Sequence, residues 1–251
     1  PLGDIMFGAV ITAARRPGGL HKTYFKEDNL RIKHALLVLI CLTSITVLNS
    51  ESIAKDSKES SDLAWHLFEQ QKYDDCYNAA IKAISMDANN YYGYYWAGMA
   101  LSEKGKFKDA ESYLQNACQI NKNVDNLLGL AICEINLGNS EKGIELLKEI
   151  NTRDPKNLNA LNWIGRTYLF KLKDNSEAIE YLEKYRNLEK NPWMLLYLGI
   201  AYSRNSQFDL AMDRLLEANG VIKENGIKDN WIIDNVNQAI DKTKDHVKLI
   251  F

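Results

Sequence analysis

The chain has 251 residues, a formal charge of −2 at pH 7 and charged side chains at 25% of its positions. This composition is typical of a soluble globular protein, and a charge near zero provides no basic patch for nucleic acid. Four cysteines are too few for a disulfide scaffold, and 14 glycines and 4 prolines exclude a collagen-like or linker-dominated chain. Scarce prolines favour helices.

Residues 35–48 (ALLVLICLTSITVL) form an uncharged run, which is preceded by Arg31 and Lys33. Its fourteen residues match the apolar core of a signal peptide and fall short of the roughly 20 that span a bilayer. Ser52 and Ala54 supply small residues where a signal peptidase cleaves. We therefore expect residues 1–54 to be a leader, and the protein to be exported (periplasmic or secreted) or membrane-anchored.

Other interpretations of this leader stay open. Translation from Leu30 as a start codon would give a precursor with a basic head, an apolar core and a cleavage site. The stretch 6–25 contains three basic residues and no acidic one, which is typical of a mitochondrial presequence, although Gly18 and Gly19 weaken it as a helix. The run 35–48 is also consistent with a buried helix.

One pattern of small residues recurs over residues 57–222. In its clearest copy Gly98 is followed by Gly105, Ala110 and Ala117, at intervals of 7, 5 and 7 residues. The leading position recurs at spacings of 34, 33, 34 and 34 residues, at Ala64, Gly98, Ala131, Gly165 and Gly199. Five copies in phase indicate a repeat protein.

This pattern resembles the tetratricopeptide repeat (TPR) family, in which each repeat is a pair of antiparallel helices that cross closely at small residues. The resemblance implies an all-α solenoid of about five repeats over residues 55–222, which stack into a right-handed superhelix. Asn90 and Asn157 are expected to be N-caps of the next repeats. Residues 223–251 are expected to form a C-terminal capping helix, and its alternative is a helix that folds into the protein's own groove.

Three features depart from the pattern. Ile150 and Tyr185 are bulky where small residues are expected, and the fourth copy has an extra residue, which we assign to 173–177. These features predict looser packing among repeats 3, 4 and 5. The polar stretch 57–61 predicts fraying of the first helix.

The sequence contains no constellation typical of catalysis, no phosphate-binding loop and no metal-ligand spacing, so we predict a non-enzymatic protein without cofactor or metal. His66 is predicted to be a surface or half-buried packing residue of the first helix. Cys76 and Cys133 are predicted to be small buried hydrophobes. A disulfide between Cys118 and Cys133 is possible only in an oxidising compartment.

The resemblance further implies that the first helices of successive repeats line a concave groove that binds peptides or helices of protein partners. The residues expected to line it are apolar and aromatic, which is typical of binding surfaces: Trp65, Phe68, Tyr92, Tyr95, Met99, Leu128, Ile132, Ile135, Asn162, Arg166, Leu169, Trp193, Leu196 and Ile200.

We therefore predict a scaffold, adaptor or assembly factor that binds protein or peptide and no nucleic acid, with membrane association through residues 35–48 possible. The alternative is a structural subunit that uses the same groove to form homo-oligomers or to pack its own C-terminal helix. Carboxylate-binding TPR domains need Lys, Asn and Arg in the groove, and only Asn162 and Arg166 have that character. Arg166 is expected to bind an acidic group of a partner or, as the alternative, an acid of its own chain.

Overall fold

The computed structural model describes residues 24–248, and it divides after Ile53 into two units, each treated by itself. The first unit contains the N-terminal part of helix α2 (Tyr24–Glu69). Within α2, the stretch Leu36–Glu69 is long and apolar enough to cross a membrane, by length and composition alone, which is a test that signal sequences also pass. Residues 6–23, which belong to the predicted mitochondrial presequence, lie outside the described part.

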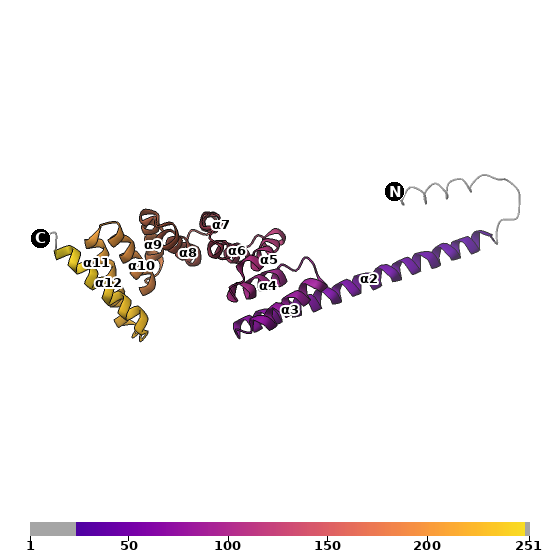
Figure 1. The fold of residues 1–251 in the computed structure, drawn as a ribbon. Coiled ribbons are helices and arrows are strands. Elements are labelled where there is room, and N and C mark those ends of the chain that lie inside the picture. Colours follow the sequence, from indigo (N-terminus) through magenta and orange to yellow (C-terminus); the bar gives the residue numbers. More distant parts are fainter. Residues whose placement is uncertain (1–23, 249–251) are drawn as a thin grey trace. The chain divides into compact units, whose positions relative to one another are not determined.

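The second unit begins within α2 and consists of helices that follow one another along the chain (Figure 1). The described residues contain no strand, which confirms the all-α prediction. The remaining helices are α3 (Tyr73–Met86), α4 (Tyr91–Glu103), α5 (Phe107–Ile120), α6 (Val124–Leu137), α7 (Ser140–Arg153), α8 (Leu158–Thr167), the π-helix η2 (Tyr168–Leu172), α9 (Asn175–Leu188), α10 (Pro192–Arg204), α11 (Phe208–Glu224) and α12 (Asn230–Lys248).

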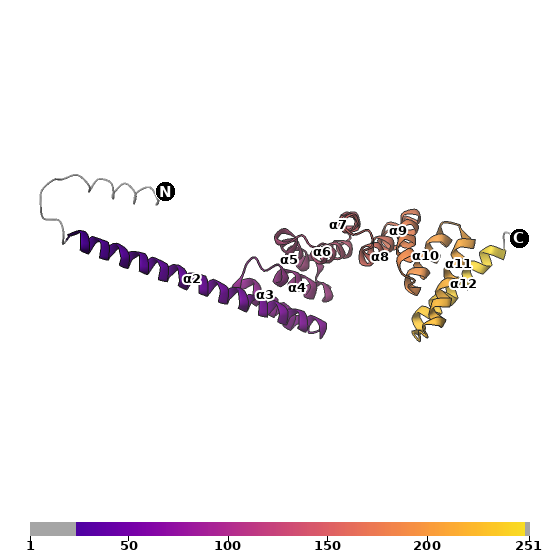
Figure 2. The same cartoon turned by 180° about the vertical axis from the view of Figure 1, so that it is seen from behind.

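Each helix from α3 onward packs against the next one, as the view from behind in Figure 2 also shows. The first helices of neighbouring repeats also touch, because α4 contacts α6, α6 contacts α8, and α10 contacts α12. The end of α2 completes the first repeat, since Ala64 lies in one core cluster with Cys76 and Ala80 of α3. The five predicted helix pairs are therefore present.

The small residues of the repeat lie where two helices cross. A methyl group added at Gly98 would lie 2.6 Å from Cγ of Leu114, and one at Gly165 would lie 2.7 Å from Cγ of Leu182. Such distances leave no room for a side chain, so glycine allows the two helices of a repeat to approach. The phase of the repeat, deduced from spacing, is confirmed by these contacts.

The second position of the repeat pattern, which is Gly105 in the clearest copy, lies where the first helix of each repeat ends. Gly105 and Gly138 have φ angles of 72° and 94°, a left-handed conformation that glycine adopts without strain. Gln71, Lys173 and Ser206 occupy the same conformation in the other repeats. After the turn, the predicted caps Asn90 and Asn157 accept hydrogen bonds from the backbone N–H groups of Gly93 and Ala160, which confirms both.

The extra residue of the fourth repeat lies earlier than predicted. The left-handed residue is Lys173, eight positions after Gly165, whereas Gly105 follows Gly98 by seven. The added residue is absorbed by the π-helix η2, whose wider turn takes up one more residue than an α-helical turn. The predicted insertion at 173–177 is therefore wrong.

The predicted loosening among repeats 3, 4 and 5 is also wrong. Ile150 is fully buried and Tyr185 is 7% exposed, and both belong to the core cluster that extends from Leu127 of α6 to Ala211 of α11. Their bulk fills the space between adjacent helix pairs. The polar stretch 57–61 does not fray either, because Ser57 is buried, donates a hydrogen bond to the carbonyl of Ala83 and accepts one from Asn90.

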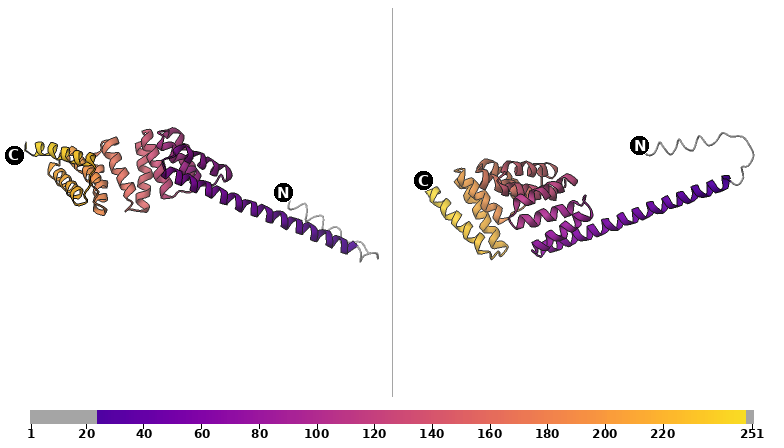
Figure 3. Two further views of the ribbon diagram at one scale, coloured as in Figure 1. Left: turned by 90° about the horizontal axis from the view of Figure 1, so that it is seen from below. Right: turned by 45° about the vertical axis from the view of Figure 1, so that its right-hand side comes forward.

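Helix α12 caps the C-terminal end of the solenoid, beside α11 in both views of Figure 3. It buries Ile232, Val236 and Ile240 against α10 and α11. The spacing of four residues places these three side chains on one stripe of the helix. Trp231 is 52% exposed and stacks on Trp193 with ring centroids 4.6 Å apart.

Candidate functional site

The first helices of the repeats carry the predicted groove residues, and most of them are accessible. Trp65 and Tyr92 are exposed, at 42% and 52%. Nine more are half-buried, so that each shows part of its surface to solvent: Phe68, Tyr95, Met99, Leu128, Ile132, Asn162, Arg166, Trp193 and Ile200.

Three predicted groove residues are buried instead and are not available to a partner in this structure. Ile135 fills the crossing of α6 with α7, where it approaches Gly143. Leu169 is fully buried because it lies in the π-helix, where the α-helical spacing used for the prediction no longer holds. Leu196 is covered by α12. The predicted lining is therefore wrong at these three positions.

Aromatic side chains of α4 form one part of this surface. Tyr92, Tyr95 and Trp96 line a hollow of about 260 Å³ together with Asn123, Asp125 and Asn126 at the start of α6. Tyr95 packs against the backbone of α6, since a methyl group added at Gly129 would lie 3.1 Å from its ring. Burial, followed by the charge of Asp125, raises the pKa of Tyr95 to about 12, so its hydroxyl stays protonated at neutral pH.

Arg166 lies in α8 between two aromatic rings. Its guanidinium carbon is 5.0 Å from the ring centroid of Trp163 and 5.6 Å from that of Tyr197 on α10, which is cation–π geometry. Among the described side chains, none forms an ion pair or a hydrogen bond with Arg166. Its Nε atom and Oδ1 of Asn162 are both enclosed without a hydrogen-bond partner. The alternative that an acid of the same chain neutralises Arg166 therefore receives no support.

Sequence reasoning missed the aromatic residues that hold this arginine. Trp163 and Tyr197 stand one position after Asn162 and Leu196, so they lie at the edge of the predicted lining. Phe170 is 42% exposed and packs edge-on against Tyr197, with centroids 5.2 Å apart. The signal that could have identified them is the recurrence of an aromatic residue two positions before the leading glycine in three repeats, at Trp96, Trp163 and Tyr197.

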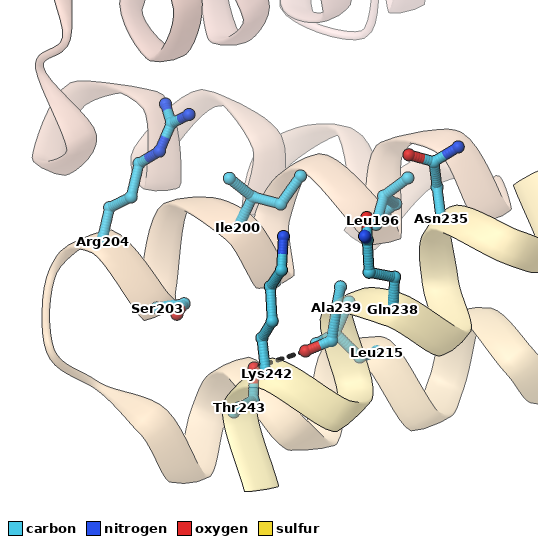
Figure 4. Close-up of a pocket in the computed structure, with 11 residues that line it drawn as sticks. Leu196, Ile200, Ser203, Arg204, Leu215, Asn235, Gln238, Ala239, Lys242 and Thr243 are labelled. Atoms are coloured by element: carbon cyan, nitrogen blue, oxygen red, sulfur yellow. Dashed lines mark hydrogen bonds between the residues drawn. The ribbon is translucent and has the colours of Figure 1, made fainter. Parts of the chain in front are cut away.

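A second hollow of about 300 Å³ lies between α10 and α12 (Figure 4). Leu196, Ile200 and Leu215 form its apolar floor, and Lys242 extends from α12 over the hollow toward Ile200. Arg204 is already engaged, because it donates a hydrogen bond to the carbonyl of Leu169 at 3.0 Å. This hollow continues the row of first helices to the C-terminal end.

The cysteines show no sign of a disulfide in the described part of the chain. Cys76, Cys118 and Cys133 are free thiols, so the pairing of Cys118 with Cys133, which the sequence left possible, is not formed in this structure. Burial raises the pKa of Cys76 to about 12 and the pKa values of Cys118 and Cys133 to about 11, so all three are protonated at neutral pH. Between residues 24 and 248, no group of three or more His, Cys, Asp or Glu side chains is placed to hold a metal ion.

Comparison with known proteins supports the repeat geometry. Models of the tetratricopeptide repeat match residues 101–162 and 158–191. Residues 101–191 are tetratricopeptide repeats. A TPR repeat-containing protein of Methanocaldococcus jannaschii, MJ1428, is 30% identical over 109 residues. That match covers 43% of this chain and only 19% of the relative.

Solved TPR structures share the fold at lower identity. MamA (residues 41 to the end) from Desulfovibrio magneticus RS-1 is 13% identical, with a TM-score of 0.62 over 70% of this chain and 98% of its own. YrrB, described as a TPR protein with an unusual peptide-binding site, is 16% identical, with a TM-score of 0.60 over 75% of this chain and 99% of its own. At these identities the likeness is one of fold alone.

Proposed function

We propose that this TPR protein is an interaction scaffold, an adaptor or assembly factor, that binds a peptide or helix of a protein partner along the first helices of its repeats. The observation that carries the proposal is Arg166. It is a cation held between Trp163 and Tyr197, and no acidic partner accompanies it among the described residues. The other accessible side chains along the first helices are mostly half-buried and apolar.

The energetics of Arg166 favour a ligand. A buried polar atom without a hydrogen bond costs about 1–3 kcal/mol, and Nε of Arg166 and Oδ1 of Asn162 are two such atoms, so a bound group that reaches them relieves this cost. The two stacked rings hold the guanidinium in place and lower the entropy lost on binding. A donor beside an acceptor matches a carboxylate together with an N–H group, and an acidic peptide segment presents both. The peptide-binding site for which YrrB is described gives a precedent on the same fold.

The second candidate is a homo-oligomer in which two copies of the chain associate through the first helices of their repeats. It is supported by the exposed apolar surface of Trp65 and Tyr92. The self-covering version accounts for α10 alone, because α12 buries Leu196 and packs against Trp193 and Ile200, which all belong to that helix. Size-exclusion chromatography with light scattering separates these possibilities, since a stable dimer of about twice 28.7 kDa would favour the oligomer.

Export or membrane anchoring through residues 35–48 belongs to the same proposal. It is supported by the uncharged run and by the apolar length of α2 over Leu36–Glu69. If the run is a cleaved signal core, we expect the mature protein to begin near Lys55, and intact-mass measurement on protein from the native host tests this. A soluble cytosolic form that retains the whole leader would contradict export.

The groove is tested with a displayed library of random 12-residue peptides that is selected on the purified full-length chain. We expect the selected peptides to contain Asp or Glu, and we expect Arg166→Ala to weaken their binding at least tenfold, as truncation of a central Arg does at interfaces. Lys108→Ala, an exposed position on α5, is the matched control and should change nothing. Equal binding by Arg166→Ala and the parent chain would place the binding site elsewhere.

The contacts of two other residues make them unsuitable for this test. Tyr95→Ala would remove packing against Gly129 and Trp96, so it should lower the melting temperature rather than leave it unchanged. Lys148→Ala would not be a neutral control, because Lys148 donates a hydrogen bond to the hydroxyl of Tyr168 at 3.0 Å. Tyr92→Ala, at an exposed ring, replaces the first variant, and Lys108→Ala replaces the second.

A further inference from the structure

The hollow between α4 and α6 differs from the rest of the row in its chemistry. Three aromatic rings line one side, those of Tyr92, Tyr95 and Trp96, and the side chain of Asp125 lies at the rim on the other. The ring of Tyr92 is half exposed and packs at a tilt against Tyr91, with centroids 4.1 Å apart, so part of the ring is presented to solvent. Trp96 is fixed from behind by Phe68, at 5.3 Å.

Asp125 is an exposed residue that lines the same hollow as these rings. No Lys, Arg or His forms an ion pair with it within the part of the chain that the structure describes. Its charge reaches the neighbouring phenols, since it contributes to the raised pKa values of Tyr91 and Tyr95, after burial in both cases. Part of its role is structural, because an acid in the first turn of α6 stabilises the helix N-terminus. That role does not require aromatic neighbours.

We propose that this hollow is a cation subsite that takes an ammonium group, such as a lysine side chain of the bound partner. Aromatic faces attract cations through their quadrupole, and the attraction grows where the ligand is partly desolvated. The carboxylate of Asp125 supplies the full countercharge, and the apolar rings pack against the methylene stem of a lysine. A neutral apolar side chain would fit the same volume but would leave Asp125 unpaired.

This inference rests on the proposed function and extends it to the chemistry of the partner. The cation subsite on α4 and α6 and the anion-binding Arg166 on α8 give the row opposite charges at two positions. First helices of successive repeats lie roughly 10 Å apart, so the two positions are separated by roughly 10–20 Å. An extended peptide covers that distance in about three to six residues. The partner segment therefore carries a basic residue and an acidic residue at about that spacing, in a fixed direction along the groove.

The test uses two small probes on the isotope-labelled full-length chain, followed by nuclear magnetic resonance of backbone amides. Nα-acetyl-lysine methylamide carries the ammonium group, and Nα-acetyl-norleucine methylamide has the same stem without charge. We expect the lysine probe to shift the amide resonances of residues 91–97 and 123–127, with a Kd on the order of 1 mM for a ligand of this size. The norleucine probe should bind about tenfold more weakly.

Variants separate the subsite from general effects of charge. Asp125→Asn should lower the affinity for the lysine probe to that of the neutral one, whereas Asp75→Asn, in the first turn of α3, should leave it unchanged. Tyr92→Leu should weaken lysine binding and Tyr92→Phe should retain it, because only the latter keeps the aromatic face. None of these variants should alter the Arg166 dependence of peptides that lack a basic residue.

The outcomes that overturn the subsite are equal affinities of the two probes, shifts that lie away from α4 and α6, or undiminished lysine binding by Asp125→Asn. Any of these would leave the peptide selection at Arg166 as it stands, so failure here is distinct from failure of the proposed function. Selected peptides that contain acidic residues but show no enrichment of Lys or Arg at three to six positions from them would equally contradict the fixed charge pattern.

Discussion

Repeats 2 and 4 reach the same helix crossing with different backbones. In repeat 2 the first helix is α-helical to its end, and Gly98 meets Leu114. Repeat 4 has one more residue, yet Gly165 meets Leu182 at nearly the same distance, because η2 takes up the excess after the crossing. An insertion is tolerated where the helix is about to end, since the packed crossing behind it need not move.

The same comparison separates two kinds of groove surface. The first helix of repeat 2 presents Tyr92 and Tyr95 beside Asp125, whereas that of repeat 4 presents Arg166 between Trp163 and Tyr197. Both surfaces include aromatic rings, but the charge beside the rings of repeat 2 is the carboxylate of Asp125 from α6 of repeat 3, whereas repeat 4 carries the cation Arg166 itself. A scaffold of equivalent crossings can therefore carry a different charge on each first helix, which is how a repeat protein gains specificity from a uniform fold.

The largest expected effect comes from filling the crossings. Gly98→Leu and Gly165→Leu each place a side chain where even one carbon would lie within 2.7 Å of a buried leucine. We expect each to destabilise the fold by about 1–3 kcal/mol, as overpacking of a rigid core does. Chemical denaturation followed by circular dichroism measures both.

The control is Gly220→Ala in α11, where nothing lies within 4 Å of the added carbon. It should stabilise the fold by about 0.5–1 kcal/mol, because alanine has the higher helix propensity. If Gly165→Leu proved neutral while Gly98→Leu did not, the crossing in repeat 4 would be looser than the structure has it, and the equivalence of the two repeats would fail.

A smaller effect is expected where repeat 4 packs on repeat 5. Glu217 of α11 accepts a hydrogen bond from Nε of Arg186 on α9 at 2.7 Å. Burial raises the pKa of Glu217, but Arg186 and Lys190 outweigh it and lower the pKa below the ordinary 4.5. A folded-state pKa below the unfolded one means that this stabilisation is present above pH 4.5 and is lost as the pH falls through the lower value.

Glu217→Gln should therefore lower the free energy of unfolding by about 1–2 kcal/mol at pH 7. The loss should become smaller as the pH falls, because protonation makes Glu217 of the parent protein neutral, like the glutamine of the variant. Denaturation at pH 7 and at pH 3 tests this. Glu180→Gln, whose ion pair with Lys184 is exposed, should change little at either pH. A penalty for Glu217→Gln that is independent of pH would show that packing, and not charge, holds the two repeats together.

The fold could be predicted from the sequence because close helix crossings require small residues, and the spacing of those residues along the chain is visible in the sequence. Small residues at a fixed period mark crossings, and left-handed ends and Asn caps mark boundaries, so helix order and repeat phase follow from Gly98, Gly105 and Asn90 without coordinates. The position of the extra residue could not be predicted, because the sequence does not tell whether Leu172 or Lys173 ends the first helix. The backbone angle of Lys173 decides it.

The site was less predictable for a related reason. Groove residues were placed by α-helical spacing, which fails at Leu169 within η2, and side-chain size decides whether a position such as Ile135 fills a crossing or faces outward. The support of Arg166 by Tyr197 joins residues from two repeats, and contacts between repeats are not encoded in the pattern of one repeat. Pairing between charges, or its absence at Arg166, likewise depends on distances that only a structure gives.

The smallest expected effect concerns the π-helix itself. The carbonyl of Leu169 in η2 accepts a hydrogen bond from Arg204 of repeat 5, whose guanidinium also lies 5.8 Å from the ring of Phe170. In repeat 3 the corresponding residue is Asn136, which bonds only within its own helix, to the carbonyl of Ile132. In the described structure, Arg204 thus joins repeat 5 to the π-helix of repeat 4, whereas Asn136 of repeat 3 makes no such hydrogen bond to repeat 2.

Arg204→Ala should destabilise the fold by about 1 kcal/mol, since a charged donor to a carbonyl contributes more than a neutral one but this side chain is largely solvent-exposed. Asn136→Ala should lie within about 0.5 kcal/mol of the parent chain. Amide hydrogen exchange gives a local readout, because loss of the Arg204 bond should speed exchange in η2 and leave the end of α6 unaffected. If exchange in η2 did not change, the extra residue would be held by the core contacts of Leu169 alone, and repeat 4 would need no help from repeat 5 to keep its different backbone.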